Sequence, residues 1–162
     1  MRKFAVSAMS ALLTACAANP FVGYDMQPGA PREAVLARMG TPTRIVRLPA
    51  GERLQYSLQP MGQRAWMVDL DAAGKVVRVR QVLNPDDFNR IQPGTWTRDD
   101  VEREFGPAAK IDRVASWPGP VMTYRWRDLA NSDMFYFVYL DGANVVRRAH
   151  PGIEFHNAPD RF

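Results

Sequence analysis

The sequence of 162 residues is poor in the side chains from which most enzyme sites are built. It contains a single cysteine, Cys16, and two histidines, His150 and His156. One cysteine excludes an intramolecular disulfide and any metal site made of several thiolates. The chain also contains no G-x-S-x-G, Walker or G-x-G-x-x-G sequence. We therefore expect a protein that is not an enzyme and that binds no cofactor.

The acidic side chains have structural rather than catalytic explanations. Asp99 and Asp100 stand where a helix is expected to begin, and Asp71 stands where a turn is expected. Asp86 and Asp87 follow a proline in an expected linker. General acid–base catalysis needs a carboxyl group positioned beside the reacting group, and none of these patterns predicts such a pair.

Both histidines lie in the C-terminal sequence AHPGIEFHNAPDRF, with Glu154 between them. Imidazole and carboxylate groups are suitable ligands for zinc. However, Pro151 and Gly152 interrupt the helical spacing that would align His150 with His156. We interpret these residues as a solvated tail and predict no metal site.

The charges are nearly balanced and form no long run of one sign. The chain has 21 basic and 17 acidic residues, a formal net charge of +4. No basic stripe with interleaved aromatic residues is present, so the sequence does not favour nucleic-acid binding. A small positive balance favours contact with anionic lipid headgroups only weakly.

Long apolar runs are also absent, and a short uncharged segment rich in apolar residues stands near the N-terminus. Residues 4–15 carry no charge and follow Arg2 and Lys3. This stretch is well short of the roughly 20 apolar residues that span a bilayer. A basic start, a short apolar segment and small residues before Cys16 predict a secretory signal peptide over residues 1–15.

The tetrapeptide Leu13-Thr14-Ala15-Cys16 resembles the lipobox of bacterial lipoproteins. The resemblance implies cleavage before Cys16, a diacylglycerol thioether on its sulfur and an acylated amino terminus. Two or three acyl chains anchor a protein stably to a membrane that it does not cross. Alanine rather than aspartate at position 17 favours an outer-membrane, periplasm-facing location, with residues 16–26 as a lipidated tether. The alternatives are a buried core thiol and simple secretion.

An internal repeat organises the remainder of the chain. The sequence QPGAPREAVLARMGTP begins at Gln27, and QPGTWTRDDVEREFGPA begins at Gln92. Further matches follow in the same order: Leu54-Gln55-Tyr56 with Met122-Thr123-Tyr124, Val68-Asp69-Leu70-Asp71 with Val138-Tyr139-Leu140-Asp141, and Val76-Val77-Arg78 with Val145-Val146-Arg147. This ordered series predicts two tandem units, residues 27–84 and residues 85–162, the second with a C-terminal tail.

Each unit is predicted to begin with a short helix. In the second unit, Thr97 and Asp100 match a capping box, and Gly106 ends the helix. In the first unit, Pro31 takes the first helical position and Gly40 ends the helix. Because the first helix has no threonine cap, we expect it to fray more readily.

After each helix the hydrophobic period changes from about 3.6 to 2, which indicates strands. The expected strands are residues 44–48, 53–58, 65–70 and 76–82 in the first unit and 109–114, 121–126, 134–140 and 144–149 in the second. The sequence thus predicts an α+β fold of two tandem units, each a short helical segment packed on a roughly four-stranded antiparallel sheet. A unit of about 60 residues has a marginal core, so we expect the two to pack together or to share a continuous sheet.

This order of elements resembles the SmpA/OmlA (BamE-like) outer-membrane lipoprotein family. The resemblance rests on a P-G start, a charged helix ending in G-x-P or G-P, an aromatic strand, and D-x-x-G or D-G before a V-V strand, and it covers residues 27–149. The tandem duplication resembles the β-lactamase-inhibitor-protein fold. The duplication departs from the single-unit assembly lipoproteins, and no partner-binding residue can be carried over from them.

Large rings are abundant and suggest protein binding. The strand MFYFVYL, residues 134–140, is apolar or aromatic on both faces, and exposed rings on a sheet suit a binding surface. The alternative is that the second face is covered by the other unit or by the tail. The expected partner-binding residues are Trp117, placed in a loop, and Trp96, Tyr136, Tyr124 and Trp66.

The resemblance implies an accessory role in outer-membrane protein assembly or envelope maintenance. The implied partners are the membrane, through the acyl chains on Cys16, and an envelope protein such as a component of the barrel-assembly machinery. The alternative function is a proteinaceous inhibitor of an envelope enzyme, such as a β-lactamase or a cell-wall hydrolase.

Overall fold

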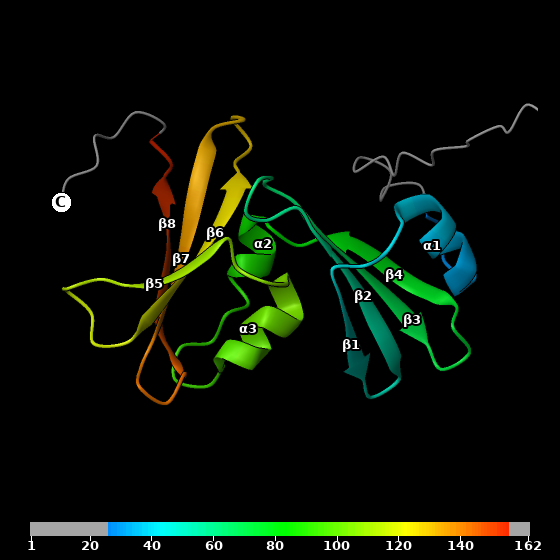
Figure 1. The fold of residues 1–162 in the computed structure, drawn as a ribbon, viewed down its shortest axis with the longest axis horizontal. Helices are drawn as coiled ribbons and strands as arrows, with labels where there is room; N and C mark the ends of the chain where they lie inside the picture. Colours follow the sequence, from blue (N-terminus) through cyan, green and yellow to red (C-terminus); the bar gives the residue numbers. More distant parts are fainter. Residues whose placement is uncertain (1–25, 156–162) are drawn as a thin grey trace, which may run out of the picture.

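The computed structural model describes residues 26–155, in which helices and sheets alternate in layers (Figure 1). Helix α1 (Arg32–Met39) precedes a sheet of β1 (Arg44–Leu48), β2 (Gly51–Ser57), β3 (Ala65–Asp71) and β4 (Val76–Gln81). Helices α2 (Pro85–Phe88) and α3 (Arg98–Phe105) precede a sheet of β5 (Lys110–Arg113), β6 (Pro120–Arg127), β7 (Asp133–Leu140) and β8 (Val146–Ile153). All neighbouring strands are antiparallel. The predicted α+β fold of two helix-plus-sheet units is confirmed.

The strands form two separate four-stranded sheets, which we call sheet 1 (β1–β4) and sheet 2 (β5–β8). The sheets therefore do not join into one continuous sheet, and of the two expected arrangements the packed one is observed. Helices α2 and α3 lie between the sheets, and α1 covers the far side of sheet 1 (Figure 1). The resulting order of layers is α1, sheet 1, α2 with α3, and sheet 2.

The two main helices begin differently and end alike. At α3, the Thr97 hydroxyl accepts a bond from the Asp100 amide at 3.3 Å, and the Asp100 carboxylate accepts one from the Thr97 amide at 2.8 Å. This is the predicted capping box. Pro31 is the N-cap of α1 and caps no amide with its side chain, so it precedes the helix instead of opening it. Gly40 and Gly106, with φ of 77° and 80°, end the helices.

A buried tyrosine ties each helix end to its own sheet. The Tyr56 hydroxyl on β2 donates to the Gly40 carbonyl at 3.1 Å. The Tyr124 hydroxyl on β6 donates to the Gly106 carbonyl at 2.9 Å, and burial raises the pKa of Tyr124. Because these bonds recur at matching places, they fix the structural alignment of the two units.

The matching aspartates form the same turn in both units. The Asp71 carboxylate accepts bonds from the amides of Ala73 and Lys75, at 2.9 and 2.8 Å. The Asp141 carboxylate accepts equivalent bonds in the β7–β8 turn. These aspartates are turn residues, as expected, because a short acidic side chain satisfies the amides of a tight turn.

Two hydrophobic cores fill the layers. The first lies between α1 and sheet 1 and contains Val35, Leu54, Tyr56, Trp66, Val68, Leu70 and Val76. The second lies between sheet 2 and the helices α2 and α3, and it also includes Ala65, Met67, Val82 and Leu83 from the first unit. The second core is thus shared, which lets two units with marginal cores stabilise one another.

Two elements differ from the expectation. The expected linker at Asp86 and Asp87 forms the one-turn helix α2, with Asn84 as its N-cap and Phe88 buried against sheet 2. Strand β8 extends to Ile153, four residues past the predicted end, so His150 belongs to a strand and not to a tail. Pro151 is tolerated because β8 is an edge strand.

A buried ion-pair network joins α3 to sheet 1. The Arg53 guanidinium binds the Asp69 carboxylate, with Nη2 and Oδ2 at 3.1 Å, and the Glu104 carboxylate of α3 at 3.1 Å. Arg78 also donates to Asp69, at 2.9 Å. Burial alone would raise the pKa of Asp69, but the hydrogen bonds and charges of Arg53 and Arg78 outweigh it and hold that pKa below its ordinary value.

We predict that Asp69→Asn destabilises the protein in a pH-dependent way. Removing one member of a buried pair costs about 3 kcal/mol. The lowered pKa means that the carboxylate stabilises the fold fully above its unfolded value of about 3.9 and loses that contribution as the pH falls through the lower folded value. The gap in unfolding free energy between wild type and variant should therefore narrow as the pH falls below about 4.

Urea unfolding of both proteins from pH 7 to pH 2 measures this gap. The control is Asp86→Asn, because Asp86 is exposed at the start of α2. A difference in unfolding free energy that stayed constant from pH 7 to pH 2 would show that the charge of Asp69 does not stabilise the fold.

Candidate partner-binding face

One face of sheet 2 is covered by no described helix or strand. In Figure 1, α2 and α3 lie on one side of β5–β8, and no element lies on the other side. We call this second side the open face. The strand register places three rows of side chains on it: Asp112–Val121–Tyr139–Arg148, Lys110–Thr123–Phe137–His150, and Arg125–Phe135 beside Gly152.

The open face carries a continuous line of aromatic rings along β7. The ring centroids of Phe135 and Phe137 are 5.7 Å apart, and those of Phe137 and Tyr139 are 6.5 Å apart. His150 stacks on Tyr139 at 5.3 Å. All of these residues are half-buried, because rings cover the sheet backbone while nothing described covers the rings. Such a contiguous apolar surface is typical of an interaction site.

A loop holds a fourth ring at the edge of the face. The Trp117 indole nitrogen donates to the Leu140 carbonyl at 2.6 Å, and its ring meets Tyr139 edge-on at 5.3 Å. The Arg148 guanidinium carbon lies 4.0 Å from the Tyr139 ring centroid and 5.6 Å from that of Trp117. These cation–π contacts orient a cation on an aromatic surface.

Beside the rings, the open face forms a groove with a volume of about 610 Å³. Two ion pairs stand at its margins: Lys110 with Asp112 at 2.5 Å, and Arg125 with Glu154 at 2.8 Å. Arg148 is exposed, and within residues 26–155 no carboxylate pairs with it. The groove is therefore apolar at its floor, and Arg148, which lies over Tyr139 outside the groove lining, has no acidic partner among the described residues.

Loop 58–64 of the first unit borders this groove. The Gln59 side-chain amide bonds both backbone groups of Arg125, donating to the carbonyl at 2.7 Å and accepting from the amide at 3.0 Å. The Arg125 guanidinium in turn donates to the carbonyl of Pro60 at 2.8 Å. These bonds satisfy the edge of β6 beyond the end of β5 and fix the first unit against sheet 2.

The structure divides the five predicted partner-binding residues between core and surface. Tyr124, Trp66 and Tyr136 are buried in the two cores, so their placement corrects the expectation that they contact a partner. Trp96 packs partly against the second core, 6.3 Å from the Phe105 ring. Trp117 lies in a loop at the edge of the open face, as predicted, and its contact with a partner stays a prediction.

The sequence does not predict which other residues lie on the open face, because that depends on the strand register. Phe135, Phe137 and Tyr139 were recognised as rings, but the alternation in MFYFVYL is hidden because both faces are aromatic. Arg148 has no sequence signal of its own, and His150 is interpreted from the sequence as part of a solvated tail. The match of Val138–Asp141 with Val68–Asp71 is a signal that could have placed the three rings on the open face, because it indicates which residues of β7 face α3.

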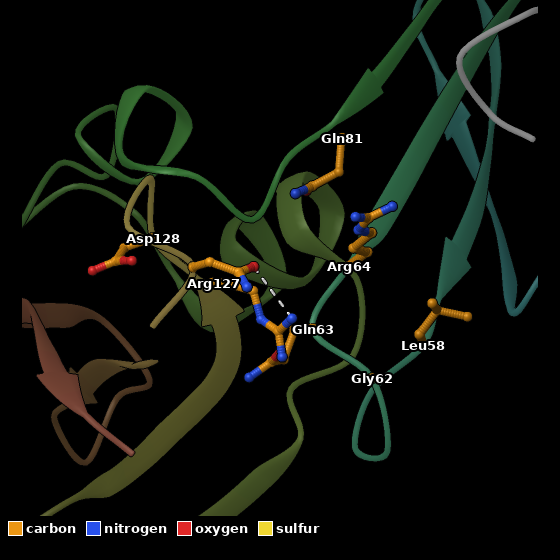
Figure 2. Close-up of a pocket in the computed structure, with 8 residues that line it drawn as sticks. Leu58, Gly62, Gln63, Arg64, Gln81, Arg127 and Asp128 are labelled. Carbon is orange, nitrogen blue, oxygen red and sulfur yellow. Dashed lines mark hydrogen bonds between the residues drawn. The ribbon is translucent and has the colours of Figure 1, made fainter. Parts of the chain in front are cut away.

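A second, polar cleft lies between the units, with a volume of about 370 Å³. Figure 2 shows side chains of both units around it, with Gln63 and Arg64 from the first and Arg127 and Asp128 from the second. Arg127 is already paired with Asp133 at 2.8 Å. This cleft presents no nucleophile and base in mutual contact, and it offers less apolar surface than the open face.

The remaining site predictions concern metal, membrane and anchor. Within residues 26–155 no cluster of three or more histidine, cysteine, aspartate or glutamate residues could hold a metal ion. Glu154 pairs with Arg125, and His150 stacks on Tyr139. None of the described helices is long and apolar enough to cross a membrane. Cys16 and His156 lie outside the described residues.

Comparison with known proteins assigns no family. No protein-family model matches the chain, and no curated protein matches its sequence. The crystal structure of a DUF4309 family protein, YjgB, from Bacillus subtilis subsp. subtilis str. 168 is similar over 77% of this chain and 79% of that chain. The identity is 13% and the TM-score is 0.31, so this similarity supports no inference about function.

We predict that the two tryptophans proposed for contact differ strongly in their effect on stability. Trp66→Ala removes a ring that is 3% exposed and should lower the free energy of unfolding by about 3–5 kcal/mol. Trp117→Ala removes one hydrogen bond and an edge contact and should cost about 1–2 kcal/mol. Urea unfolding of each variant measures both values, and equal losses would contradict the placement of Trp117 on the surface.

Proposed function

We propose that this protein is a lipid-anchored envelope protein whose body binds another protein, as an accessory to outer-membrane protein assembly or envelope maintenance. The observation that carries the proposal is the open aromatic face of sheet 2. A half-buried line of rings beside an exposed arginine is a surface that gains from being covered by a partner.

Two features of the sequence support the cellular setting. The lipobox-like Leu13-Thr14-Ala15-Cys16 supports acylation of Cys16 and attachment to a membrane surface, and Ala17 favours the outer membrane. The resemblance of residues 27–149 to the SmpA/OmlA family supports a role in assembly. Residues 16–26 would then serve as the tether, and the ten residues after Cys16 would reach about 33 Å if fully extended, which keeps the body close to the membrane.

The order of helix and sheet layers also indicates which unit would contact the partner. Helices α2 and α3 separate the two sheets, so the first unit serves as a support for the second, and sheet 2 presents its free side outward (Figure 1). A rigid, shared core behind a binding face lowers the entropy cost of association, because the rings are already ordered.

We predict that depletion of the protein in its host lowers the level of folded outer-membrane porins and raises sensitivity to detergent. Wild type should restore both, whereas Cys16→Ser should leave the membrane fraction and fail to restore them. Porin bands before and after heating, growth in detergent and fractionation are the measurements. Unchanged porin levels and detergent resistance after depletion would refute the assembly role. Strong inhibition of a purified β-lactamase or cell-wall hydrolase would favour the inhibitor function instead.

A further inference from the structure

The first unit shows what kind of element covers this face of the repeated sheet. On sheet 1, the equivalent face is covered by the last turn of α3. Arg53 donates to the Arg103 carbonyl at 3.0 Å, and Gln55 donates to the Glu102 carbonyl at 2.9 Å. Met67 packs beside Gly106 at the end of the helix. A helix C-terminus therefore seats across β2 and β3, with its free carbonyls satisfied by the sheet.

The open face of sheet 2 has the same layout. The recurring Tyr56 and Tyr124 bonds, together with the Asp71 and Asp141 turns, align the two sheets. In that alignment the strand partners Arg53–Asp69–Arg78 correspond to Val121–Tyr139–Arg148, and Gln55–Met67–Arg80 correspond to Thr123–Phe137–His150. Arg78 therefore aligns with Arg148 and not with Arg147, one residue from the match that the sequence predicts. The charged residues Arg53 and Asp69 of the helix seat are thus replaced by Val121 and Tyr139, while the outer strand keeps an arginine at position 148.

Charge identifies the kind of helix that fits. On sheet 1, acidic residues of the second unit meet the basic residues: Glu104 lies 3.1 Å from Arg53 and 3.8 Å from Arg80, and Asp87 pairs with Arg80. On sheet 2, Arg148 takes the place of Arg78, which pairs with Asp69 of its own sheet. Tyr139 replaces that aspartate, so Arg148 has no carboxylate partner among the described residues. A covering helix with an acidic residue would supply the carboxylate that the sheet itself no longer provides to Arg148.

A second copy of this chain fits less well. If copies stacked head to tail, α1 of the next copy would take the place of α3. The last turn of α1 carries Arg38 and no carboxylate, whereas that of α3 carries Glu102 and Glu104, so a second copy would bring a basic group and no acid to the face that carries Arg148. Like charges brought together in an interface oppose association. The occupant is therefore a different chain.

We infer that the open face of sheet 2 binds the C-terminal turn of an amphipathic helix from a partner protein, with an Asp or Glu of that helix paired to Arg148. The inference rests on the proposed function as a protein-binding body and adds the class of partner. Apolar residues of the helix cover Phe135, Phe137 and Tyr139, and Trp117 closes one side. This is helix-on-sheet recognition by apolar anchors with one oriented charge.

Photo-crosslinking in the host tests this directly with the full, acylated chain. Benzoylphenylalanine replaces Phe137 on the open face, and in a control it replaces Val77, which is 57% exposed on sheet 1. The crosslinked peptides are sequenced by mass spectrometry. The expected adduct at position 137 is a segment of another protein with apolar residues at helical spacing and an acidic residue within one turn. The control position should not yield that segment.

Charge reversal then tests the role of Arg148. Arg148→Glu should reduce the yield of the adduct at least about tenfold, and replacing the acidic residue of the partner with Arg should restore it. Arg148→Gln should give a smaller loss. Arg47→Glu is the matched control, because Arg47 is an exposed arginine on β1 of the other sheet, and it should leave the yield unchanged. Urea unfolding of each variant confirms that the fold is kept.

Several outcomes would overturn the inference. They are an adduct with residues 156–162 of the same chain, with a second copy, with lipid or with an extended strand, no adduct at position 137, or a yield that Arg148→Glu does not change.

The two proposals fail separately. If Arg148→Glu fully restores porin levels after depletion, the helix site is wrong and the assembly role stands. If a helix adduct forms but depletion has no effect, the site stands and the assembly role is wrong.

Discussion

The architecture depends on the seating of the α3 C-terminus against sheet 1. Arg53 and Gln55 donate to the last helix carbonyls, and Arg53 also pairs with Asp69 and with Glu104. Arg53 and Gln55 are buried, and each takes part of its hydrogen bonds from the other unit. The contact orients α3, and α3 in turn orients sheet 2 through the shared core. Neither unit could hide these polar groups alone.

Most of the fold could be predicted because the signals are local and occur twice. The capping box at Thr97, the glycine ends at Gly40 and Gly106, and the aspartate turns are short motifs with one geometric solution each. Helix α2 was missed because a one-turn helix has no period to detect, although Asn84 followed by Pro85 is a cap and a first helical residue.

The candidate site was harder to predict because the burial of an aromatic ring depends on how the helices and sheets pack together. Tyr124 and Tyr139 are similar in sequence context, yet one lies at the helix end and the other on the open face. Only the register between strands separates them, since a shift of one residue exchanges the two faces. The end of strand β8 was predicted too early for a related reason. Pro151 taken alone indicates the end of a strand, but a proline is acceptable in an edge strand.

A linear stack of helix-plus-sheet units always has two unlike ends. One end exposes a helix, here α1, and the other exposes a sheet, here sheet 2 (Figure 1). Repeat proteins usually make such terminal surfaces polar, because no further unit will cover them. In this chain the terminal sheet has instead replaced the charged residues Arg53 and Asp69 of the inner sheet with Val121 and Tyr139. The end of the stack is thus more apolar than its interior junction, which favours a surface that binds another chain.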